Sequence, residues 1–207
     1  MDDISGRTNI DELYKNSNMN KWIKRIPIYK TVLFTEYHKN KDFVYVADII
    51  LDNETYTSGK KKRRTLIQFI PKIPIYEFNE KREWLYIFTI NGRIVKIGGT
   101  RVGLQGRTAS YLCGHHVKER GKSGDCSKTN AFIYNTFVFY LEQGCKIEMY
   151  GYPLQKKEYT VYLFDEKITI PVQTYHVYES VYLQKYKQEY HDYPFLCDNC
   201  DPNYKLD

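Results

Sequence analysis

No stretch of this 207-residue chain is both long and apolar. A membrane-spanning helix needs about 20 consecutive apolar residues, and no run approaches that length. The first residues, MDDISGRTN, lack the basic-then-apolar pattern of a secretory signal. We therefore expect a soluble, cytoplasmic protein with no membrane partner.

Cysteine is scarce, and its number, five, is odd. An odd number in an intracellular protein argues for reduced thiols rather than a disulfide framework. Cys197 and Cys200 have a zinc-like spacing. The residues with which this pair would complete a tetrahedral site are Cys113, His115, His116 and Cys126. Because these form no second tight ligand pair, the sequence argues against structural zinc, and whether Cys197 and Cys200 bind a metal stays open.

Composition favours a globular protein that can meet a polyanion. The 42% of hydrophobic residues suffice for a core, and the formal charge of +6 permits binding to nucleic acid. The basic residues gather in two clusters, which we take as candidate DNA contacts: Lys60, Lys61, Lys62, Arg63 and Arg64, then Lys118, Arg120, Lys122 and Lys128. The first lies between two predicted strands and should cap a hairpin. Solvated loops are the alternative for both clusters.

The order of predicted elements indicates an α+β fold with a small antiparallel sheet flanked by helices. Residues 1–80 read as an N-terminal β-rich arm, with a helix at 10–26 and strands at 31–37, 43–51 and 65–70. Prolines at 71 and 74 make a joint. Residues 81–207 form the second domain, with a hairpin in 82–99, helices at 103–112, 129–143 and 175–190, a strand at 146–152 and a hairpin around Asp165-Glu166.

The hairpin in residues 82–99 turns at Asn91-Gly92. If these two residues alone form the turn, Tyr86 opposes Ile97 and Lys96 faces away from it. A three-residue loop, with Gly92 in a bulge, pairs Tyr86 with Lys96 instead. We predict the three-residue loop, because it places the phenol and the ammonium on one face.

Three more residues favour phosphate chemistry. Arg107 and Tyr111 are four apart on a predicted helix, so both can reach one phosphate; a solvated arginine and a packed tyrosine are the alternative. Glu179 has Tyr175 and Leu183 four residues to either side, and a carboxylate on a partly apolar face needs a cation such as magnesium. A surface glutamate that pairs with a lysine is the competing interpretation.

This ordered set resembles the GIY-YIG nuclease superfamily, and most of all a compact type II restriction endonuclease. The first motif corresponds to Leu85-Tyr86-Ile87 and the second to Lys96-Ile97-Gly98. Lysine stands where the family usually has tyrosine. Arg107, Tyr111 and Glu179 match the remaining catalytic positions, and the resemblance covers roughly residues 82–204.

The resemblance implies a GIY-YIG-type nuclease domain in residues 81–207, a DNA-embracing arm in residues 1–80, and sequence-specific, magnesium-dependent hydrolysis of double-stranded DNA. Tyr86 would be the general base, Lys96 its activator, Arg107 and Tyr111 the phosphate ligands and Glu179 the metal ligand, with Asn199 in support. A homodimer and a companion DNA methyltransferase are expected. A homing or repair nuclease on this scaffold and a non-catalytic DNA-binding protein are the alternatives.

Overall fold

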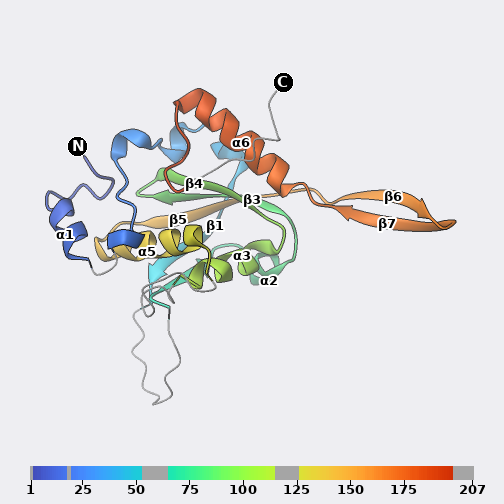
Figure 1. Cartoon of the computed structure of the whole chain (residues 1–207), viewed down its shortest axis with the longest axis horizontal. Helices are drawn as coiled ribbons and strands as arrows, with labels where there is room; N and C mark the ends of the chain where they lie inside the picture. Colours follow the sequence, from blue (N-terminus) through green and yellow to red (C-terminus); the bar gives the residue numbers. More distant parts are fainter. Residues whose placement is uncertain (1, 18–19, 53–64, 115–125, 198–207) are drawn as a thin grey trace, which may run out of the picture.

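The centre of the protein is a five-stranded antiparallel sheet with the strand order β2-β1-β5-β3-β4 (Figure 1). The structure is a computed structural model that describes residues 2–17, 20–52, 65–114 and 126–197. The strands are β1 (Val44–Leu51), β2 (Ile67–Pro71), β3 (Trp84–Ile90), β4 (Arg93–Thr100) and β5 (Ile147–Pro153). The predicted α+β class is confirmed.

Helices cover both faces of this sheet. α3 (Gly103–Leu112) and α5 (Lys128–Glu142) lie on one face, and α6 (Tyr175–Tyr190) lies on the other (Figure 1). Tyr86 and Phe88 of β3 join the core with α5, whereas Leu85 and Ile87 join the core with α6. This is the period-two alternation of a strand that is buried on both sides. The three helices predicted in the second half of the chain are confirmed, with α5 shifted by one residue.

The β3–β4 turn differs from the prediction. Ile90 pairs with Arg93, so only Asn91 and Gly92 form the turn. Both have positive φ, 48° and 74°, as a type I′ turn requires. The predicted three-residue loop is wrong.

A β-bulge provides the extra residue instead. The register shifts between Phe88 and Thr89, and Val95 of β4 has no partner in the ladder. Beyond the bulge Phe88 pairs with Lys96 and Tyr86 with Gly98. Since Tyr86 and Phe88 point to the same face, Lys96 shares the face of Tyr86, although the two are not directly paired.

The N-terminal region holds less regular structure than its sequence predicts. α1 spans Ile10–Asn16 rather than 10–26, and a 3-10 turn follows at Asn20–Trp22. The predicted strand at 31–37 is wrong: it contains one isolated bridge and a 3-10 turn at Phe34–Glu36. Val32, Phe34 and Tyr37 pack into the core with α6, so tertiary packing explains their apolar character. The remaining short elements are 3-10 turns at Ile28–Lys30 and Asn40–Asp42 and the helix α2 at Ile75–Asn79, which the sequence did not predict.

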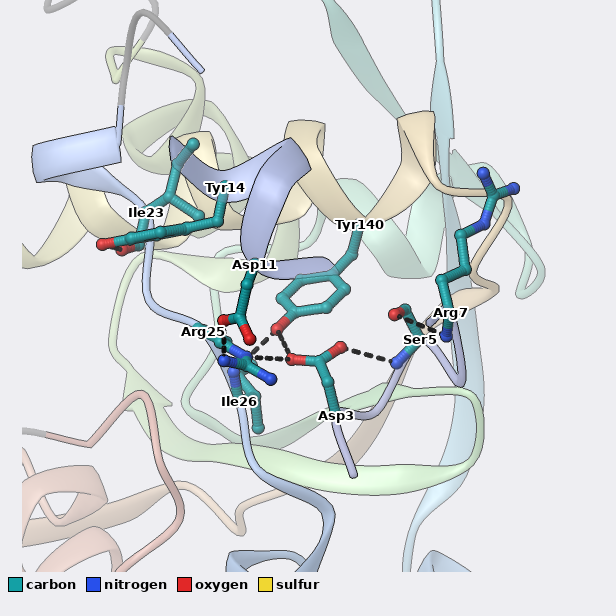
Figure 2. Close-up of polar contacts among 9 residues, drawn as sticks. All are labelled: Asp3, Ser5, Arg7, Asp11, Tyr14, Ile23, Arg25, Ile26 and Tyr140. Atoms are coloured by element: carbon teal, nitrogen blue, oxygen red, sulfur yellow. Dashed lines mark hydrogen bonds and ion pairs between the residues drawn. The ribbon is translucent and has the colours of Figure 1, made fainter. Parts of the chain in front are cut away.

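A buried carboxylate fastens the N-terminal segment to α5 (Figure 2). Asp3 is 4% exposed. Its Oδ2 accepts a hydrogen bond from the Tyr140 hydroxyl at 2.9 Å, and that hydroxyl oxygen accepts one from the Ile26 N–H at 2.6 Å. Arg25 Nε lies 3.7 Å from the same carboxylate oxygen, so the buried charge has a cation beside it.

Strands from both predicted halves of the chain form the central sheet. β1 pairs with β5, and β2 pairs with β1. Residue 80 therefore does not separate two sheets, and a DNA-embracing role for residues 1–80 stays a prediction. The basic cluster at residues 60–64 lies outside the described residues.

A second sheet projects from the molecule between β5 and α6 (Figure 1). It consists of β6 (Lys157–Leu163) and β7 (Glu166–Val172), which confirms the predicted hairpin around Asp165-Glu166. Both strands are largely exposed along their length. Within the described residues, no helix is long and apolar enough to cross a membrane.

Candidate active site

Tyr86 lies against a glycine of the neighbouring strand. A Cβ atom added to Gly98 would lie 2.4 Å from the Tyr86 hydroxyl oxygen, far inside van der Waals contact. Only glycine leaves room for the ring, as expected where a strand glycine marks a close approach. Gly98 therefore determines where the phenol lies.

Gly99 likewise leaves room for a close approach, here by side chains of α6 on the opposite face of the sheet. A Cβ atom added there would lie 2.8 Å from the Tyr175 ring and 3.1 Å from Glu179 Oε2. The Gly99 N–H donates a hydrogen bond to the Glu179 carboxylate. Two consecutive glycines thus allow Tyr86 and Glu179 to approach β4 from its two faces. The sequence placed Gly98 in the second motif and Gly99 at the end of the hairpin, without predicting these close approaches.

α3 brings Arg107 and Tyr111 to the Tyr86 hydroxyl. Arg107 Nε donates to the Tyr86 oxygen at 2.8 Å, and Nη2 donates to the Tyr111 oxygen at 2.9 Å. The two hydroxyl oxygens are 2.6 Å apart. The guanidinium carbon also lies 4.4 Å from the centre of the Tyr111 ring. One turn of helix therefore presents both side chains to one point, as the four-residue spacing predicts.

Lys96 is the most enclosed cation of the cluster. It is 6% exposed, and its Nζ donates to the Leu196 carbonyl at 3.5 Å. The segment before residue 198 runs beside β4, because the Leu196 N–H donates to the Val95 carbonyl at 2.8 Å. This contact was not predicted; the only sequence signal for it is the apolar character of Phe195 and Leu196.

Burial dominates the protonation of the two phenols. It raises the pKa of Tyr86 well above its ordinary value, with Tyr111 adding to the effect, although Arg107 and Lys96 act in the opposite direction. Burial likewise raises the pKa of Tyr111 to about 12. Lys96 and Arg107 act on the pKa of Tyr86 in the direction expected of an activator, and burial outweighs them. Activation by Lys96 together with a metal ion stays a prediction.

The charged members of the cluster act on one another. Burial raises the pKa of Glu179 above its ordinary value, while Lys96, Arg107 and the Gly99 N–H lower it by less. Burial lowers the pKa of Lys96, but Cys197, Tyr86 and Glu179 outweigh burial and raise it. For Arg107, too, burial lowers the pKa and the two tyrosines raise it by more. The five predicted residues thus form one electrostatic unit.

Glu179 fits a magnesium ion as its protein ligand. Magnesium in phosphoryl-transfer sites is commonly held by one or two carboxylates, together with water and substrate phosphate. The described residues include no cluster of three His, Cys, Asp or Glu side chains that would hold an ion by protein groups alone. Burial raises the pKa of the Glu179 carboxyl despite the opposing effect of Lys96 and Arg107, and a bound cation would act in the same direction as these two residues.

Two solved structures resemble this arrangement of elements. One is the restriction endonuclease HPY188I in complex with product DNA: the TM-score is 0.50, the identity is 20%, and the match covers 92% of this chain and 91% of that chain. The two proteins share a fold. The other is a variant of EndoII of bacteriophage T4, with a TM-score of 0.46, 20% identity, and coverage of 75% of this chain and 96% of that one. No family model matches the chain, and no curated protein does.

The remaining predicted residues are only partly described. Lys60, Lys61, Lys62, Arg63, Arg64, Lys118, Arg120, Lys122, Asn199 and Cys200 lie outside the described residues. Lys128 begins α5 and is exposed. The sulfur atoms of Cys113 and Cys126, considered above as metal ligands, lie 2.8 Å apart. A DNA-binding role for Lys128 stays a prediction.

Proposed function

We propose that this protein is a DNA endonuclease that hydrolyses phosphodiester bonds with the help of magnesium, and specifically a type II restriction endonuclease. One observation carries the proposal: Arg107 holds the hydroxyl groups of Tyr86 and Tyr111 at one point, close enough to Lys96 and Glu179 for their charges to act on Tyr86. The fold shared with HPY188I, whose structure contains product DNA, supports it. So does the resemblance of the ordered residues to the GIY-YIG superfamily.

Arg107 is the principal phosphate ligand in this proposal. A guanidinium carries five N–H donors, and its bonds to Tyr86, Tyr111 and Ser110 use three of them. The remaining two can donate to a phosphate oxygen. Tyr111, held by Arg107, positions a phosphate oxygen or the attacking water through its hydroxyl. Positive charge from Arg107 and Lys96 then neutralises the charge that develops on phosphorus substituents during attack.

Tyr86 is the general base. Its oxygen accepts from Arg107 Nε, and this bond strengthens as the phenol loses its proton. Lys96 on the same sheet face adds positive charge. Glu179 would hold magnesium, which when bound supplies charge stabilisation for the departing oxygen. Burial raises the pKa of Tyr86, and the charges of Arg107 and Lys96 act in the opposite direction, as a bound metal ion would.

A restriction role adds further expectations. One active site cuts one strand, so a two-fold symmetric dimer is the simplest enzyme that cuts both strands of a short palindromic site. Such an enzyme acts in the cytoplasm beside a DNA methyltransferase that protects the host sequence. The exposed Lys128 and the two basic clusters are candidates for contacts to the DNA backbone.

Incubation of the protein with plasmid DNA, with and without magnesium, tests the proposal. Discrete fragments that appear only with magnesium are expected. Nicking of branched substrates alone would favour a repair nuclease, and cutting at a single long site a homing enzyme. DNA binding without cleavage would replace the proposal with a non-catalytic DNA-binding protein.

A further inference from the structure

The β6–β7 hairpin has one apolar face. Side chains of paired residues point to the same face of a sheet, and they alternate along each strand. Tyr159 pairs with Ile170 and Val161 with Ile168, so these four share a face. The same alternation adds Leu163 and Val172 to them. The opposite face carries Glu158, Thr160, Tyr162, Lys167, Thr169 and Pro171.

This apolar face has no cover. Tyr159 is 67% exposed, Leu163 53% and Ile170 46%, and the hairpin extends away from the central sheet (Figure 1). Alternation of apolar and polar residues is the pattern of a sheet whose apolar side packs on a core. A lone two-stranded hairpin is only marginally stable in water. An uncovered apolar face on such a hairpin is typical of a protein interaction site.

The charges on this face indicate which partner fits. Its two charged residues are Lys157, at the base of the hairpin, and Glu166, at the tip. A nucleic acid would require cations along the whole face, yet the positions between the two ends are apolar. A second copy of the hairpin, packed face to face and antiparallel about a two-fold axis, fits this pattern, because Lys157 then lies at the same end as Glu166 of the partner subunit, diagonally across the interface. Lys157 Nζ donates to the Tyr178 hydroxyl at 3.2 Å, which leaves two of its three N–H groups for a carboxylate.

We propose that two copies of this chain associate through the apolar face of the β6–β7 hairpin, packed face to face and antiparallel. The surface is defined by Lys157, Tyr159, Val161, Leu163, Glu166, Ile168, Ile170 and Val172. The central apolar positions Tyr159, Val161, Ile168 and Ile170 meet their counterparts in the partner, and each end of the interface brings Lys157 of one copy diagonally beside Glu166 of the other.

The hairpin is directly connected to the candidate active site. Thr174, between β7 and α6, donates through its N–H and hydroxyl to the Glu83 carboxylate at 2.9–3.0 Å. Arg101 Nη1 donates to Gln173 at 3.1 Å. Glu179 follows on α6, so the proposed dimer would carry two copies of the candidate site, each adjoining the shared hairpin. Its use in cutting both strands rests on the proposed function, whereas the association itself does not.

Sedimentation velocity of the purified full chain, without DNA, tests the association. The wild type is expected to be a dimer. Ile170→Glu should give a monomer, and Thr169→Glu, one residue away on the polar face, should remain a dimer. Both positions are exposed, so matching circular dichroism and thermal unfolding of the two variants will show that folding is not the cause. A monomeric wild type, or equal association of both variants, would overturn the proposal.

Charge reversal tests the antiparallel arrangement. Lys157→Glu and Glu166→Lys should each raise the dissociation constant of the dimer by about tenfold, and the double variant should restore it. If the double variant dimerises no more tightly than the single variants, the antiparallel arrangement is wrong. A monomeric wild type whose DNA affinity falls with Ile170→Glu would assign the face to DNA. A dimer that does not cut DNA would refute the proposed nuclease alone, and a monomer that cuts DNA would refute this interface alone.

Discussion

At the scale of single residues, the candidate site depends on two positions that have no side chain. Gly98 leaves room for the Tyr86 ring, and Gly99 for the Glu179 carboxylate. The five chemical groups could be predicted from the sequence, because their types and order suit phosphate chemistry. The positions of the rings and the size of the burial effect on Tyr86 could not, since both arise from packing between strands and helices that are distant in sequence.

Gly98→Ala is expected to displace the Tyr86 ring. Overpacking of this kind costs about 1–3 kcal/mol, and the displaced hydroxyl would lose its bond to Arg107, so both stability and cleavage should fall. Denaturant unfolding and a plasmid assay measure the two effects. Gly106→Ala in α3, where the added methyl meets only the exposed Val102 side chain, serves as control. Unchanged stability and cleavage in Gly98→Ala would contradict the close approach.

Glu179→Gln is expected to stabilise the protein at neutral pH. The pKa of Glu179 is raised in the folded state, so folding favours its protonated form and ionisation destabilises the protein as pH rises through the folded-state pKa. The difference in melting temperature between the variant and the wild type should be small in acid, below the ordinary glutamate pKa, and grow toward neutrality. If the melting temperature of the wild type instead rises relative to that of the variant as pH increases, the pKa of Glu179 is not raised in the folded protein.

If Tyr86 is the general base, the rate of DNA cleavage should increase with pH. Because burial raises the pKa of Tyr86 above its ordinary value, the phenol is largely protonated near neutral pH, and the phenolate fraction increases about tenfold for each pH unit below that pKa. Single-turnover cleavage by the wild type should rise accordingly, and Tyr86→Phe should lose both the rate and this dependence. A variant with the same pH profile as the wild type would remove Tyr86 from the base role.

At the scale of elements, helices and strands were predicted best where the local sequence pattern matches the way the segment packs. α3 and α6 have the predicted bounds because their apolar residues recur at helical spacing and their ends coincide with changes in that pattern. Residues 31–37 carry a strand-like pattern, but Val32, Phe34 and Tyr37 pack without a strand partner along their length. The extra residue of the β3–β4 hairpin lies in a bulge rather than in the turn, a difference that the turn residues do not encode.

The hydroxyl group of Tyr140 attaches the N-terminal segment to α5 and should therefore contribute to the stability of the protein. Tyr140→Phe removes one of the hydrogen bonds to the Asp3 carboxylate, which keeps Ser5 and Arg25 beside it. It also leaves the Ile26 N–H without its acceptor. Buried groups left without partners cost about 1–3 kcal/mol, so the free energy of unfolding should fall by that amount. Tyr76→Phe, at a position that is 76% exposed, is the control. Equal stability of the two variants in urea unfolding would show that the bonds around Asp3 contribute nothing.

At the scale of the whole molecule, the fold joins what the sequence suggested were two parts. β1 and β2 extend the sheet that carries the candidate site, and the N-terminal segment is bonded to α5. Long-range pairings such as β1 with β5 cannot be inferred from local patterns, because either strand reads equally well as part of a separate hairpin. We propose that β3, β4, α3 and α6 together form a nuclease site, with Tyr86 and Lys96 on the strands and Arg107, Tyr111 and Glu179 on the helices.

Glu179→Gln tests that claim most directly when cleavage and DNA binding are measured on the same preparation. We predict single-turnover plasmid cleavage with magnesium to be slowed at least about 10²-fold, while DNA affinity without magnesium stays close to that of the wild type. Glu142→Gln, at an exposed glutamate at the end of α5, should cleave normally. Cleavage by Glu179→Gln at the wild-type rate would contradict the account.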